Sequence, residues 1–429
     1  MRCTIPKDRL SASMAVMSHG GATGRLDPAL GGRITVRAVR RADGGGALVC
    51  EATDGEIAAR HVTPATVEQE GVAVVPGRQF ADVVRALRDD VVSLALAEGR
   101  LAVRAGKQHF RVVATGDDTA PPMPAVDFGA AVAIQGSVLA DLIADTRFAV
   151  AEPNDGRAAL RGALWEVKGS GMEFVGTNGH RLAWSKAQLA MEGAGAACLA
   201  GRAVVPGPAL EAIGDVFGEA GAVLVSRRRP AGEATGGEAQ GEVAESGYLG
   251  FQTAAVSHAG RIETTLYVRL IGEPYPDWRR VLPKPQEITR EAILETAPLR
   301  AAVEGVMVMA TDKAKRVIVS LNGSARITAD TPDAGDAGDE VPLVSYSGDE
   351  MRIGFNGSYL LDTLRHVHTP FVRLQLTAPE RAVVVDGIEA QQEDGAQRET
   401  APGGGARRAG KARARAGQAA QLLMPLREL

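Results

Sequence analysis

His180 is the side chain in this sequence best suited to acid–base chemistry, because an imidazole titrates close to neutral pH. Ser185 or Asp277 could join it in a catalytic pair if the fold brought them together. The sequence contains no GxSxG, HExxH or Walker motif and no pattern of paired carboxylates. An enzyme is therefore the weaker hypothesis, and turnover of a nucleotide or nucleic acid by the purified protein alone would revive it.

Metal ligands are equally sparse along the chain. His366 and His368 are close in sequence, but two histidines without further ligands are a weak metal signature. Cys3, Cys50 and Cys198 lack CxxC spacing, which argues against a zinc site and a disulfide framework. We expect the cysteines to be small buried apolar residues, and we expect no metal or cofactor.

Composition indicates a globular protein of several domains. The length of 429 residues allows about three domains, and apolar and charged residues make up 45% and 23%. Neither a membrane-spanning apolar run nor a secretory signal at Met1–Pro6 is evident, so we expect a cytoplasmic protein. The net charge of −4 shows no basic excess, so any contact with DNA must use local patches or a means other than bulk charge.

The segments that would position these residues recur along the chain. Val74–Gly77 is repeated letter for letter as Val204–Gly207, and each copy leads into an amphipathic run typical of a helix. A third such run follows the apolar stretch that ends at Gly354–Ser358. Each of these sites predicts a strand that feeds directly into a helix.

Each unit contains a second predicted helix, upstream of the strand-to-helix run. Its apolar positions lie inside Leu10–Met17, Val138–Ile143 and Leu299–Val306. Chance recurrence of amphipathic helices is the alternative, but the shared order and spacing argue against it. The repeat predicts an α+β fold of three similar domains, each with two helices packed on antiparallel sheets. Three similar units in one chain favour closure into a ring, because a repeated head-to-tail contact either closes or forms a filament.

Related turns separate the predicted strands of each unit. They fall at Ala52–Gly55, at Gly176–Gly179 and, more loosely, at Thr328–Thr331. Glycine and Asp or Asn are the residues that such tight turns favour. These turns would equally explain the residues around His180 without any binding role.

We place the domain boundaries at 1–126, 127–286 and 287–429. Domain two carries a predicted flexible insertion at 227–247, rich in Gly, Ala and Glu, and domain three a predicted disordered insertion at about 389–419. The second insertion contains a basic series that could touch nucleic acid phosphates, although a solvated segment is the simpler interpretation. Its members are Arg407, Arg408, Lys411, Arg413 and Arg415.

Two longer motifs carry a resemblance to a known family. Phe174–Ala183 resembles the Ala-Thr-Asp-Gly-His-Arg-Leu-Ala signature of bacterial DNA sliding clamps, the beta subunits of DNA polymerase III. Tyr275–Lys284 resembles the second signature of that family, and Met424–Arg427 resembles its C-terminus. The resemblance implies a non-catalytic subunit that forms a head-to-tail homodimer, a six-domain ring around duplex DNA. Such a ring gives the polymerase processivity by topology.

The resemblance also implies a hydrophobic cleft between domains two and three. It would receive short peptide motifs of DNA polymerase, the clamp loader and repair proteins, with apolar walls for anchor side chains and polar groups that fix the peptide backbone. Carried over by motif, domain two contributes Leu160, Thr177, Gly179, His180, Arg181, Leu182, Pro276, Arg280 and Val281, and domain three contributes Asn356, Tyr359, Met424, Pro425, Leu426 and Arg427.

DNA contacts are less well marked than the cleft. The resemblance places Arg25 and Arg78 toward the hole, and exposed charges that serve solubility are the alternative. The predicted helix that opens with Gly207–Pro208 lacks the basic pair of the family, and alanines at 158 and 159 replace its DNA-contacting tyrosines. A clamp paralogue that binds partner peptides in an accessory or inhibitor-resistance role is therefore the second hypothesis.

Smaller departures fall in the motifs themselves. Asn178 replaces the usual Asp, which removes a charge but keeps a turn-forming side chain. Glu428 adds a carboxylate beside a cleft that should be apolar, which leaves the alignment of the last three residues open.

Overall fold

The structure is a computed structural model, and it describes residues 1–21, 32–41, 44–189, 194–228, 247–257, 260–389 and 418–426. Two compact units emerge from the packing of the backbone. Unit 1 comprises Met1–Ile143, Leu164–Met172 and Gln188–Tyr275, and unit 2 comprises Ala144–Ala163, Glu173–Ala187 and Pro276–Leu429. Residues of the predicted second domain belong to both units, and the three domain boundaries stay predictions.

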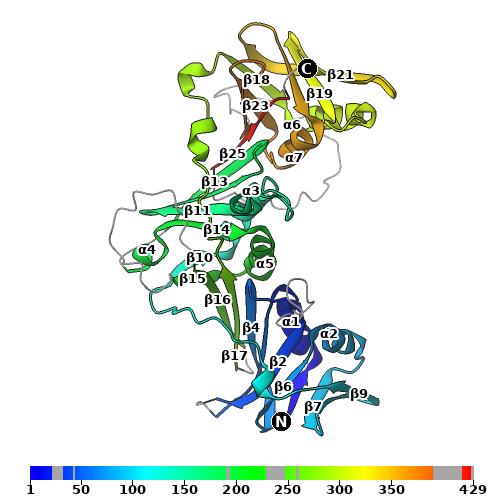
Figure 1. Cartoon of the computed structure of the whole chain (residues 1–429), viewed down its shortest axis with the longest axis vertical. Coiled ribbons are helices and arrows are strands. Elements are labelled where there is room, and N and C mark those ends of the chain that lie inside the picture. The colour runs from blue at the N-terminus through cyan, green and yellow to red at the C-terminus, as the bar shows by residue number, and fades with distance from the viewer. Residues whose placement is uncertain are drawn as a thin grey trace, which may run out of the picture. The chain divides into compact units, whose positions relative to one another are not determined.

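Unit 1 contains two antiparallel sheets, with strand orders β5-β1-β7-β8-β9 and β10-β15-β16-β17-β4-β3-β2-β6 (Figure 1). The first part of its chain forms β1 (Arg2–Pro6), α1 (Lys7–His19), β2 (Arg33–Arg40), β3 (Gly46–Thr53), β4 (Ile57–Pro64), β5 (Thr66–Gln69), β6 (Gly71–Pro76), α2 (Gly77–Ala86), β7 (Val91–Ala97), β8 (Arg100–Ala105), β9 (Gln108–Val113) and the short η1 (Asp117–Thr119). The later part adds β10 (Val132–Gln135), α4 (Ala194–Leu199), β14 (Gly201–Pro206), α5 (Gly207–Phe217), β15 (Ala222–Arg228), β16 (Tyr248–Ser257) and β17 (Gly260–Arg269).

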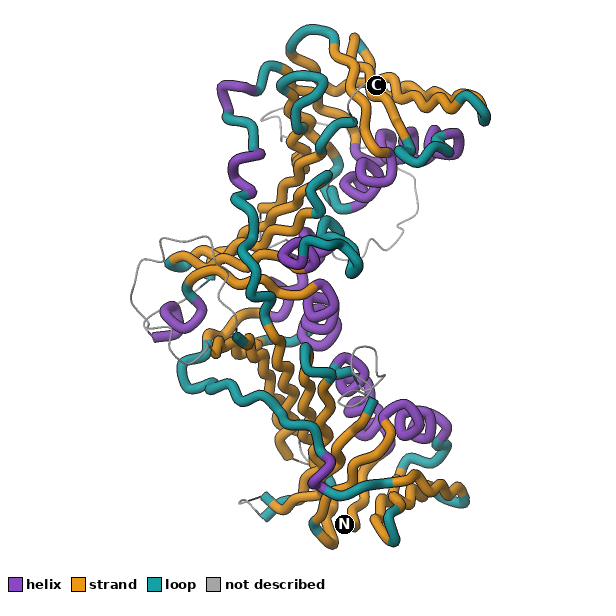
Figure 2. The backbone as a smooth tube through the Cα atoms, viewed as in Figure 1, coloured by secondary structure: helices purple, strands orange, loops and turns teal. Residues whose placement is uncertain are grey.

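Unit 2 contains a long run of antiparallel strands, and strands are drawn in orange in Figure 2. Their order is β13-β25-β24-β23-β18-β21-β20-β19-β22. Its elements are η2 (Ala158–Arg161), η3 (Trp278–Val281), η4 (Pro285–Glu287), β18 (Arg290–Glu295), α6 (Thr296–Val306), η5 (Met307–Met309), β19 (Arg316–Asn322), β20 (Ser324–Thr331), β21 (Gly335–Ser347), β22 (Met351–Asn356), α7 (Gly357–Arg365), β23 (Phe371–Leu376), β24 (Val383–Ile388) and β25 (Gln418–Leu423). Four elements have residues in both units: α3 (Gly136–Arg147), β11 (Gly162–Lys168), β12 (Gly171–Thr177) and β13 (Arg181–Gln188).

The predicted strand-to-helix junctions are confirmed. In each repeat a strand runs without a loop into a helix twice, as β1-α1 and β6-α2, β10-α3 and β14-α5, and β18-α6 and β22-α7. Pro76 and Pro206 end their strands in extended conformation, with φ of −61° and −56°, directly before the helix begins. Asn356 ends β22 instead, and its side-chain oxygen accepts hydrogen bonds from the amides of Ser358 and Tyr359 at 3.0 and 3.3 Å.

Glycine opens four of these six helices, and at Gly136 and Gly357 the junction leaves no room for a side chain. At Gly357, a Cβ atom would lie 2.7 Å from a methyl group of Val317 and 3.1 Å from the carbonyl oxygen of Lys315. Leu360, Leu361 and Leu364 of α7 then pack into the buried core of unit 2. The apolar spacing that predicts the helix is therefore the face that the core buries.

The predicted turns are the same in two repeats and displaced in the third. The Thr53 hydroxyl accepts from the amide of Gly55, and the Asp54 carboxylate accepts from the amides of Glu56 and Ile57. Thr177 and Asn178 make the matching bonds in the second repeat. The third turn was placed wrongly, since Thr328–Thr331 belong to β20, where they pair with β21 before the chain turns.

Strand pairing joins the predicted repeats. Within unit 1, β17 pairs with β4, and Thr264 lies opposite His61. Within unit 2, β25 pairs with β13, from Gln418 opposite Lys186 to Leu423 opposite Arg181. In both cases the last strand of one repeat adds to the fourth strand of the repeat before it.

Both predicted insertions begin or end too far into ordered strands. Arg227 and Arg228 belong to β15, and Arg227 is buried, with a hydrogen bond of 2.9 Å to the carbonyl of Arg202. Gln418 and Ala419 belong to β25, where backbone pairing with β13 holds them. Residues 229–246 and 390–417, including the basic series from Arg407 to Arg415, lie outside the described residues.

The cysteines are free, and two of the three are buried as expected. Burial raises the pKa of the Cys3 and Cys50 thiols to about 12, so both stay protonated. Cys198 is only partly buried, and its sulfur accepts a hydrogen bond from the amide of Arg227 at 3.4 Å.

The join between β4 and β17 makes a prediction about pH. His61 is buried there, with Nδ1 3.0 Å from the Thr264 hydroxyl, and burial lowers its pKa from 6.5 to about 4. The unfolded chain takes up this proton near pH 6.5 but the folded chain only near 4, so stability should fall as pH drops through that window. We expect a loss of about 2 kcal/mol between pH 7.5 and 5 from this residue.

Urea unfolding of the wild type and of His61→Gln at both pH values measures this contribution. The Gln variant keeps a polar side chain that cannot titrate, so its stability should change less between the two pH values. An identical pH dependence in both proteins would contradict the assignment.

Candidate partner-binding site

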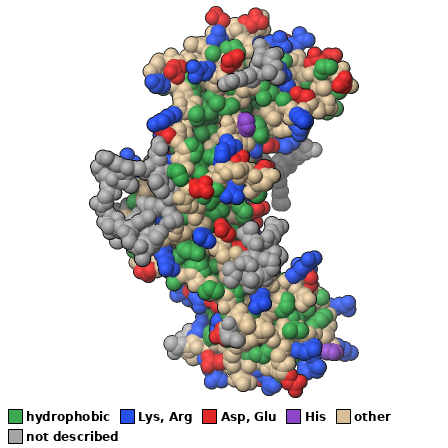
Figure 3. All heavy atoms as spheres, in the orientation of Figure 1, with side chains coloured by type: hydrophobic (Ala, Val, Ile, Leu, Met, Phe, Trp, Pro, Cys, Tyr) green, Lys and Arg blue, Asp and Glu red, His purple; other side chains and the backbone are tan. Residues whose placement is uncertain are grey.

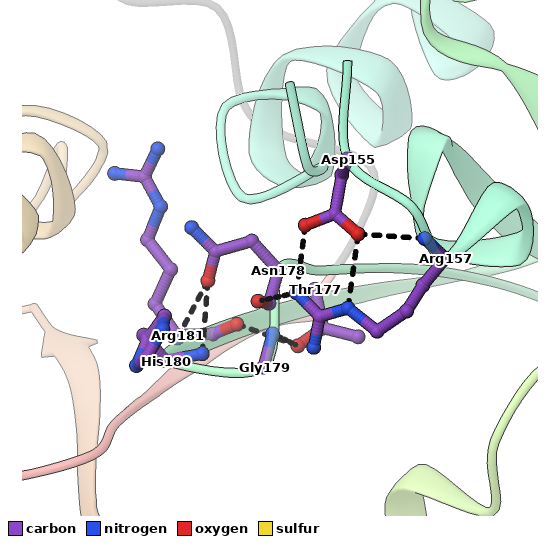
Figure 4. Close-up of polar contacts among 7 residues, drawn as sticks. All are labelled: Asp155, Arg157, Thr177, Asn178, Gly179, His180 and Arg181. Atoms are coloured by element: carbon purple, nitrogen blue, oxygen red, sulfur yellow. Dashed lines mark hydrogen bonds and ion pairs between the residues drawn. The ribbon is translucent and has the colours of Figure 1, made fainter. Parts of the chain in front are cut away.

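The turn between β12 and β13 is the centre of the site (Figure 4). The Thr177 hydroxyl donates to the carbonyl of Arg181 at 2.7 Å and accepts from the amide of Gly179 at 3.1 Å. The Asn178 side chain accepts from the amides of His180 and Arg181, both at 3.0 Å. Gly179 takes a φ of +85°, a conformation that side chains other than glycine rarely adopt. The sequence therefore specifies a rigid turn that holds His180 at an exposed position.

Arg157 lies against this turn and was not predicted to. Its guanidinium donates to the carbonyl of Asn178 at 2.9 Å and pairs with the Asp155 carboxylate through Nε and a terminal nitrogen, at 2.9 and 2.7 Å (Figure 4). Hydrogen bonding to Arg157 lowers the pKa of Asp155 to about 2. The carboxylate is therefore charged across the physiological pH range and keeps Arg157 in place.

Arg181 is turned inward, with a side chain only 11% exposed. Its guanidinium pairs with the Asp362 carboxylate at 2.7 Å and donates a second hydrogen bond to the carbonyl of Phe148. The same group lies over two rings, 4.8 Å from the centroid of Tyr359 and 5.3 Å from that of Phe148. The strand β13, the loop after α3 and the helix α7 thus meet at one cation.

The aromatic rings extend this cluster at both ends. Tyr359 stacks with His180 at a centroid distance of 6.0 Å and an interplanar angle of 18°. Phe148 stacks on His366 at 3.9 Å and 11°. The imidazole of His366 also donates from Nδ1 to the carbonyl oxygen of Asp362, at 2.7 Å. His366 therefore packs against the cluster, with its Nδ1 held by a backbone carbonyl.

The C-terminal segment closes the site from β25. The amide of Met424 donates to the carbonyl of His180 at 3.0 Å, and the amide of Leu426 donates to the carbonyl of Gly354 at 2.8 Å. Met424 is 39% exposed, whereas Pro425 and Leu426 are partly buried. The segment thus adds apolar surface directly beside the His180 turn.

The second signature, Tyr275–Lys284, is a linker segment that its tryptophan anchors. Trp278 is buried and packs against Trp184 of β13 at a centroid distance of 5.8 Å. Arg279 lies over the Trp278 ring and pairs with Glu173 of β12. This anchor fixes the exposed residues that follow, Arg280 and Val281.

The predicted wall residues fall into three groups. Contacts connect Thr177, Gly179, His180 and Arg181 with Tyr359 and the segment Met424–Leu426. Leu160 and Leu182 are buried, whereas Pro276, Arg280 and Val281 are exposed on the linker, where Arg280 pairs with Asp277 at 2.9 Å. Asn356 uses its side-chain oxygen to cap α7, and Arg427 lies outside the described residues.

The residues that the sequence reasoning missed are Phe148, Asp155, Arg157, Asp362 and the tryptophan pair. Trp278 stood inside a recognised motif and could have been found there. Phe148 and Asp362 carry no local signal, because only the packing of distant segments brings them to Arg181.

The catalytic hypothesis loses its proposed pair in this geometry. Ser185 is buried on β13, and its hydroxyl donates to the Asp145 carboxylate at 2.9 Å, whereas His180 is exposed. Asp277 pairs with Arg280. Among the described residues, no group of three or more His, Cys, Asp or Glu side chains could hold a metal ion.

The structure adds little support for DNA contacts by the two predicted residues, Arg25 and Arg78. Arg25 lies outside the described residues, and Arg78 is exposed in the first turn of α2. The α5 helix has no lysine or arginine, and its Asp215 lies 4.0 Å from His19 of α1. No helix of the described residues is long and apolar enough to cross a membrane.

Comparison with known proteins gives the same family at every level. Models of the N-terminal, central and C-terminal domains of the DNA polymerase III beta subunit match residues 43–124, 133–217 and 279–397. The beta sliding clamp of Vibrio cholerae is 29% identical over 347 residues, covering 80% of this chain and 85% of that protein. The beta sliding clamp of Escherichia coli K12 is 27% identical over 406 residues, covering 91% and 97%.

Solved structures agree in fold. The DNA polymerase sliding clamp of Bacillus subtilis superimposes with a TM-score of 0.78 at 22% identity, and the DNA polymerase III beta subunit of Pseudomonas aeruginosa with 0.77 at 24%, each covering 100% of both chains. The fold is that of a sliding clamp, with three clamp domains of helices and antiparallel sheets. The chain belongs to the DNA polymerase III beta subunit family, the bacterial beta sliding clamps.

The turn at Gly179 makes a prediction about stability. Gly179→Ala should cost about 1–2 kcal/mol of unfolding free energy, because the new side chain must adopt a positive φ. Gly156→Ala is the matched control, since its φ is not in that region and a Cβ there meets no atom within 4 Å. Chemical denaturation of both variants checks this. Equal stability of the two would show that the turn is not held in this conformation.

Proposed function

We propose that this chain is a working DNA sliding clamp, a non-catalytic cytoplasmic protein whose homodimer closes around duplex DNA and tethers the polymerase. One observation carries the proposal beyond family membership, namely the rule by which the repeats join. The last strand of repeat two (β17) pairs with the fourth strand of repeat one (β4), and the last strand of repeat three (β25) pairs with the fourth strand of repeat two (β13).

Among the described strands, one last strand (β9) and one fourth strand (β21) take no part in a joint of this kind. β9 is the last strand of repeat one and lies at the edge of its sheet. β21 is the fourth strand of repeat three, and its part from Gly335 to Pro342 pairs with β20 on one side. A head-to-tail pair of chains joined twice through β9 and β21 would continue the pattern and close a ring of six domains.

The charges of these two edges are complementary. Lys107 and Arg111 are exposed at or beside β9, whereas Asp336, Asp339 and Glu340 are exposed on β21. In Figure 3, blue basic side chains gather around the end of unit 1 where Figure 1 labels β9. Opposite charges favour pairing of unlike edges and disfavour pairing of like edges, which would fix the head-to-tail direction.

A charge-reversal experiment tests this interface. Lys107→Glu with Arg111→Glu should make the protein monomeric at micromolar concentration, and so should Asp336→Lys with Asp339→Lys. A mixture of the two variants should form heterodimers, because each of the two joints then pairs opposite charges. Native mass spectrometry distinguishes these outcomes, since the variants have different masses. Two stable homodimers, or a mixture that stays monomeric, would contradict the β9–β21 joint.

Closure around DNA would explain how a chain with net charge −4 stays on a polyanion. Topological retention requires no strong affinity, so few phosphate contacts are needed. Arg25 and Arg78 are the proposed contacts from domain one. The acidic residues of α5 and the alanines at 158 and 159 fit weak direct binding.

The second part of the proposal is the partner cleft. The turn at His180, the ring of Tyr359 and the apolar segment Met424–Leu426 form a wall suited to short peptides of the polymerase, the clamp loader and repair proteins. Leu160, Leu182, Pro276, Arg280, Val281, Asn356 and Arg427 complete the proposed set. A sliding clamp of Pseudomonas aeruginosa has been solved bound to griselimycin, which supports a ligand site on this fold.

Tyr359 provides the test of the cleft. Tyr359→Ala should reduce the affinity for a fluorescein-labelled peptide from the clamp-binding segment of a polymerase III catalytic subunit by at least about tenfold, as expected for a buried aromatic anchor. Tyr359→Phe is the matched control, because it keeps the ring that contacts His180 and Arg181. Deletion of residues 424–429 should have the same effect as Tyr359→Ala. Unchanged affinity in both the Ala variant and the deletion, with the dimer intact, would place the cleft elsewhere.

The alternative is a paralogue that binds partner peptides in an accessory or inhibitor-resistance role. The scarcity of basic residues on α5 favours it. The two functions separate in primer extension on a primed circular template, where a replicative clamp lengthens the products of the polymerase and an accessory copy does not.

A further inference from the structure

The chain of contacts around Arg181 reaches well beyond the residues of the proposed cleft. It runs from His366 to Phe148, from Phe148 to Arg181, from Arg181 to Tyr359 and from Tyr359 to His180, with ring or cation–ring distances of 3.9, 5.3, 4.8 and 6.0 Å. Only its last members, Tyr359 and His180, lie in the proposed cleft wall together with Arg181. Phe148 and His366 lie outside the proposed wall, so their role must be a different one.

Arg181 itself is poorly placed to bind a partner. Its side chain is 11% exposed, and its terminal nitrogens are bonded to Asp362 and to the carbonyl of Phe148. Its Nε is buried and has no hydrogen-bond partner among the described residues. A largely buried cation of this kind contributes through the groups that it holds, because turning it outward would leave the partly exposed Asp362 carboxylate and the carbonyl of Phe148 without this partner.

Asp362 is the hub of this arrangement. Its carboxylate holds Arg181 at 2.7 Å, and its backbone carbonyl accepts from His366, which in turn stacks on Phe148. It belongs to α7, one turn from Tyr359 on the same helix. Asp362 therefore fixes Arg181 directly through its carboxylate. It also supports Phe148, one of the two rings beside Arg181, through His366.

We propose that Asp362 is a positioning residue for partner binding, which locks Arg181 between Phe148 and Tyr359 and so sets the orientation of the Tyr359 and His180 rings. This inference rests on the proposed peptide cleft. It assigns Arg181 to the support of the wall and not to direct contact with the peptide. It also gives His366, singled out by the sequence as one half of a weak metal pair, a structural task in the same network.

The experiment compares Asp362→Asn with Asp362→Glu and Arg365→Gln. Asn keeps the shape of the side chain but loses the charge that holds Arg181, so affinity for the labelled polymerase peptide should fall about tenfold, in the range measured for loss of a partly buried charged partner. Glu keeps the charge and should restore most of that affinity. Arg365 also neighbours Asp362, at 3.9 Å, but is half exposed and lies outside the chain of rings, so Arg365→Gln should bind as the wild type does.

Two further readouts separate positioning from general destabilisation. Phe148→Leu, which removes a ring without touching the proposed wall, should weaken peptide binding with the dimer retained. In the Asp362→Asn protein, most of the difference in peptide affinity between Tyr359→Phe and Tyr359→Ala should also disappear, because a ring that is no longer oriented contributes less to binding. Wild-type affinity of both Asp362→Asn and Phe148→Leu would overturn the inference. If the wild type itself fails to bind the peptide, the proposed cleft is wrong, which is a distinct result.

Discussion

Backbone pairing between edge strands is the interaction on which the rest of this structure depends. An edge strand presents unpaired amides and carbonyls, and a protein must cover, charge or pair them. Here β17 pairs with β4 and β25 pairs with β13, so the edges of successive repeats satisfy one another. Because each join uses the same two kinds of strand, the pattern predicts its own continuation at β9 and β21. Closure into a ring would therefore follow from pairing of the two remaining edge strands, β9 and β21.

The proposed partner site depends on the same pairing. β13 carries the His180 turn at its start, and β25 pairs along it before the chain continues into Met424–Leu426. The C-terminal segment can reach the turn only because the register of β25 on β13 ends with Leu423 opposite Arg181. The joint that links the second and third repeats therefore also builds the proposed wall. Assembly and the proposed partner binding share one structural element, which would explain a site at the joint between two repeats.

Much of the fold could be predicted because its signals are local. The strand-to-helix junctions follow from a short apolar run, a proline or asparagine and a glycine, and the turns at Thr53 and Thr177 follow from side chains that bond to the amides next to them. The third turn was misplaced because Thr328–Thr331 match the motif only loosely, and pairing with β21 decides their conformation. The resemblance likewise indicated the residues of the proposed cleft, and the structure brings the His180 turn into contact with Tyr359 and with the segment Met424–Leu426.

What the sequence could not supply is the direction of side chains. Arg181 and Asn356 were both assigned to the wall, yet one is held inward by Asp362 and the other caps α7. The partners of Arg181, Phe148 and Asp362, are far away in the chain, and such contacts arise only when the sheet and helix pack, so no local rule predicts them. The cap at Asn356 is different, because an asparagine directly before a helix is itself a local signal for this contact.

The central claim, a ring that holds DNA by topology, is tested most directly by loading the protein onto a circular DNA with a clamp loader and then cutting the circle. Gel filtration of the complex before and after cutting measures retention. The account predicts that the protein elutes with intact circles at a salt concentration that abolishes simple charge contacts, and that it is released once the DNA is linear. Equal retention on linear and circular DNA, or no retention on intact circles, would contradict it.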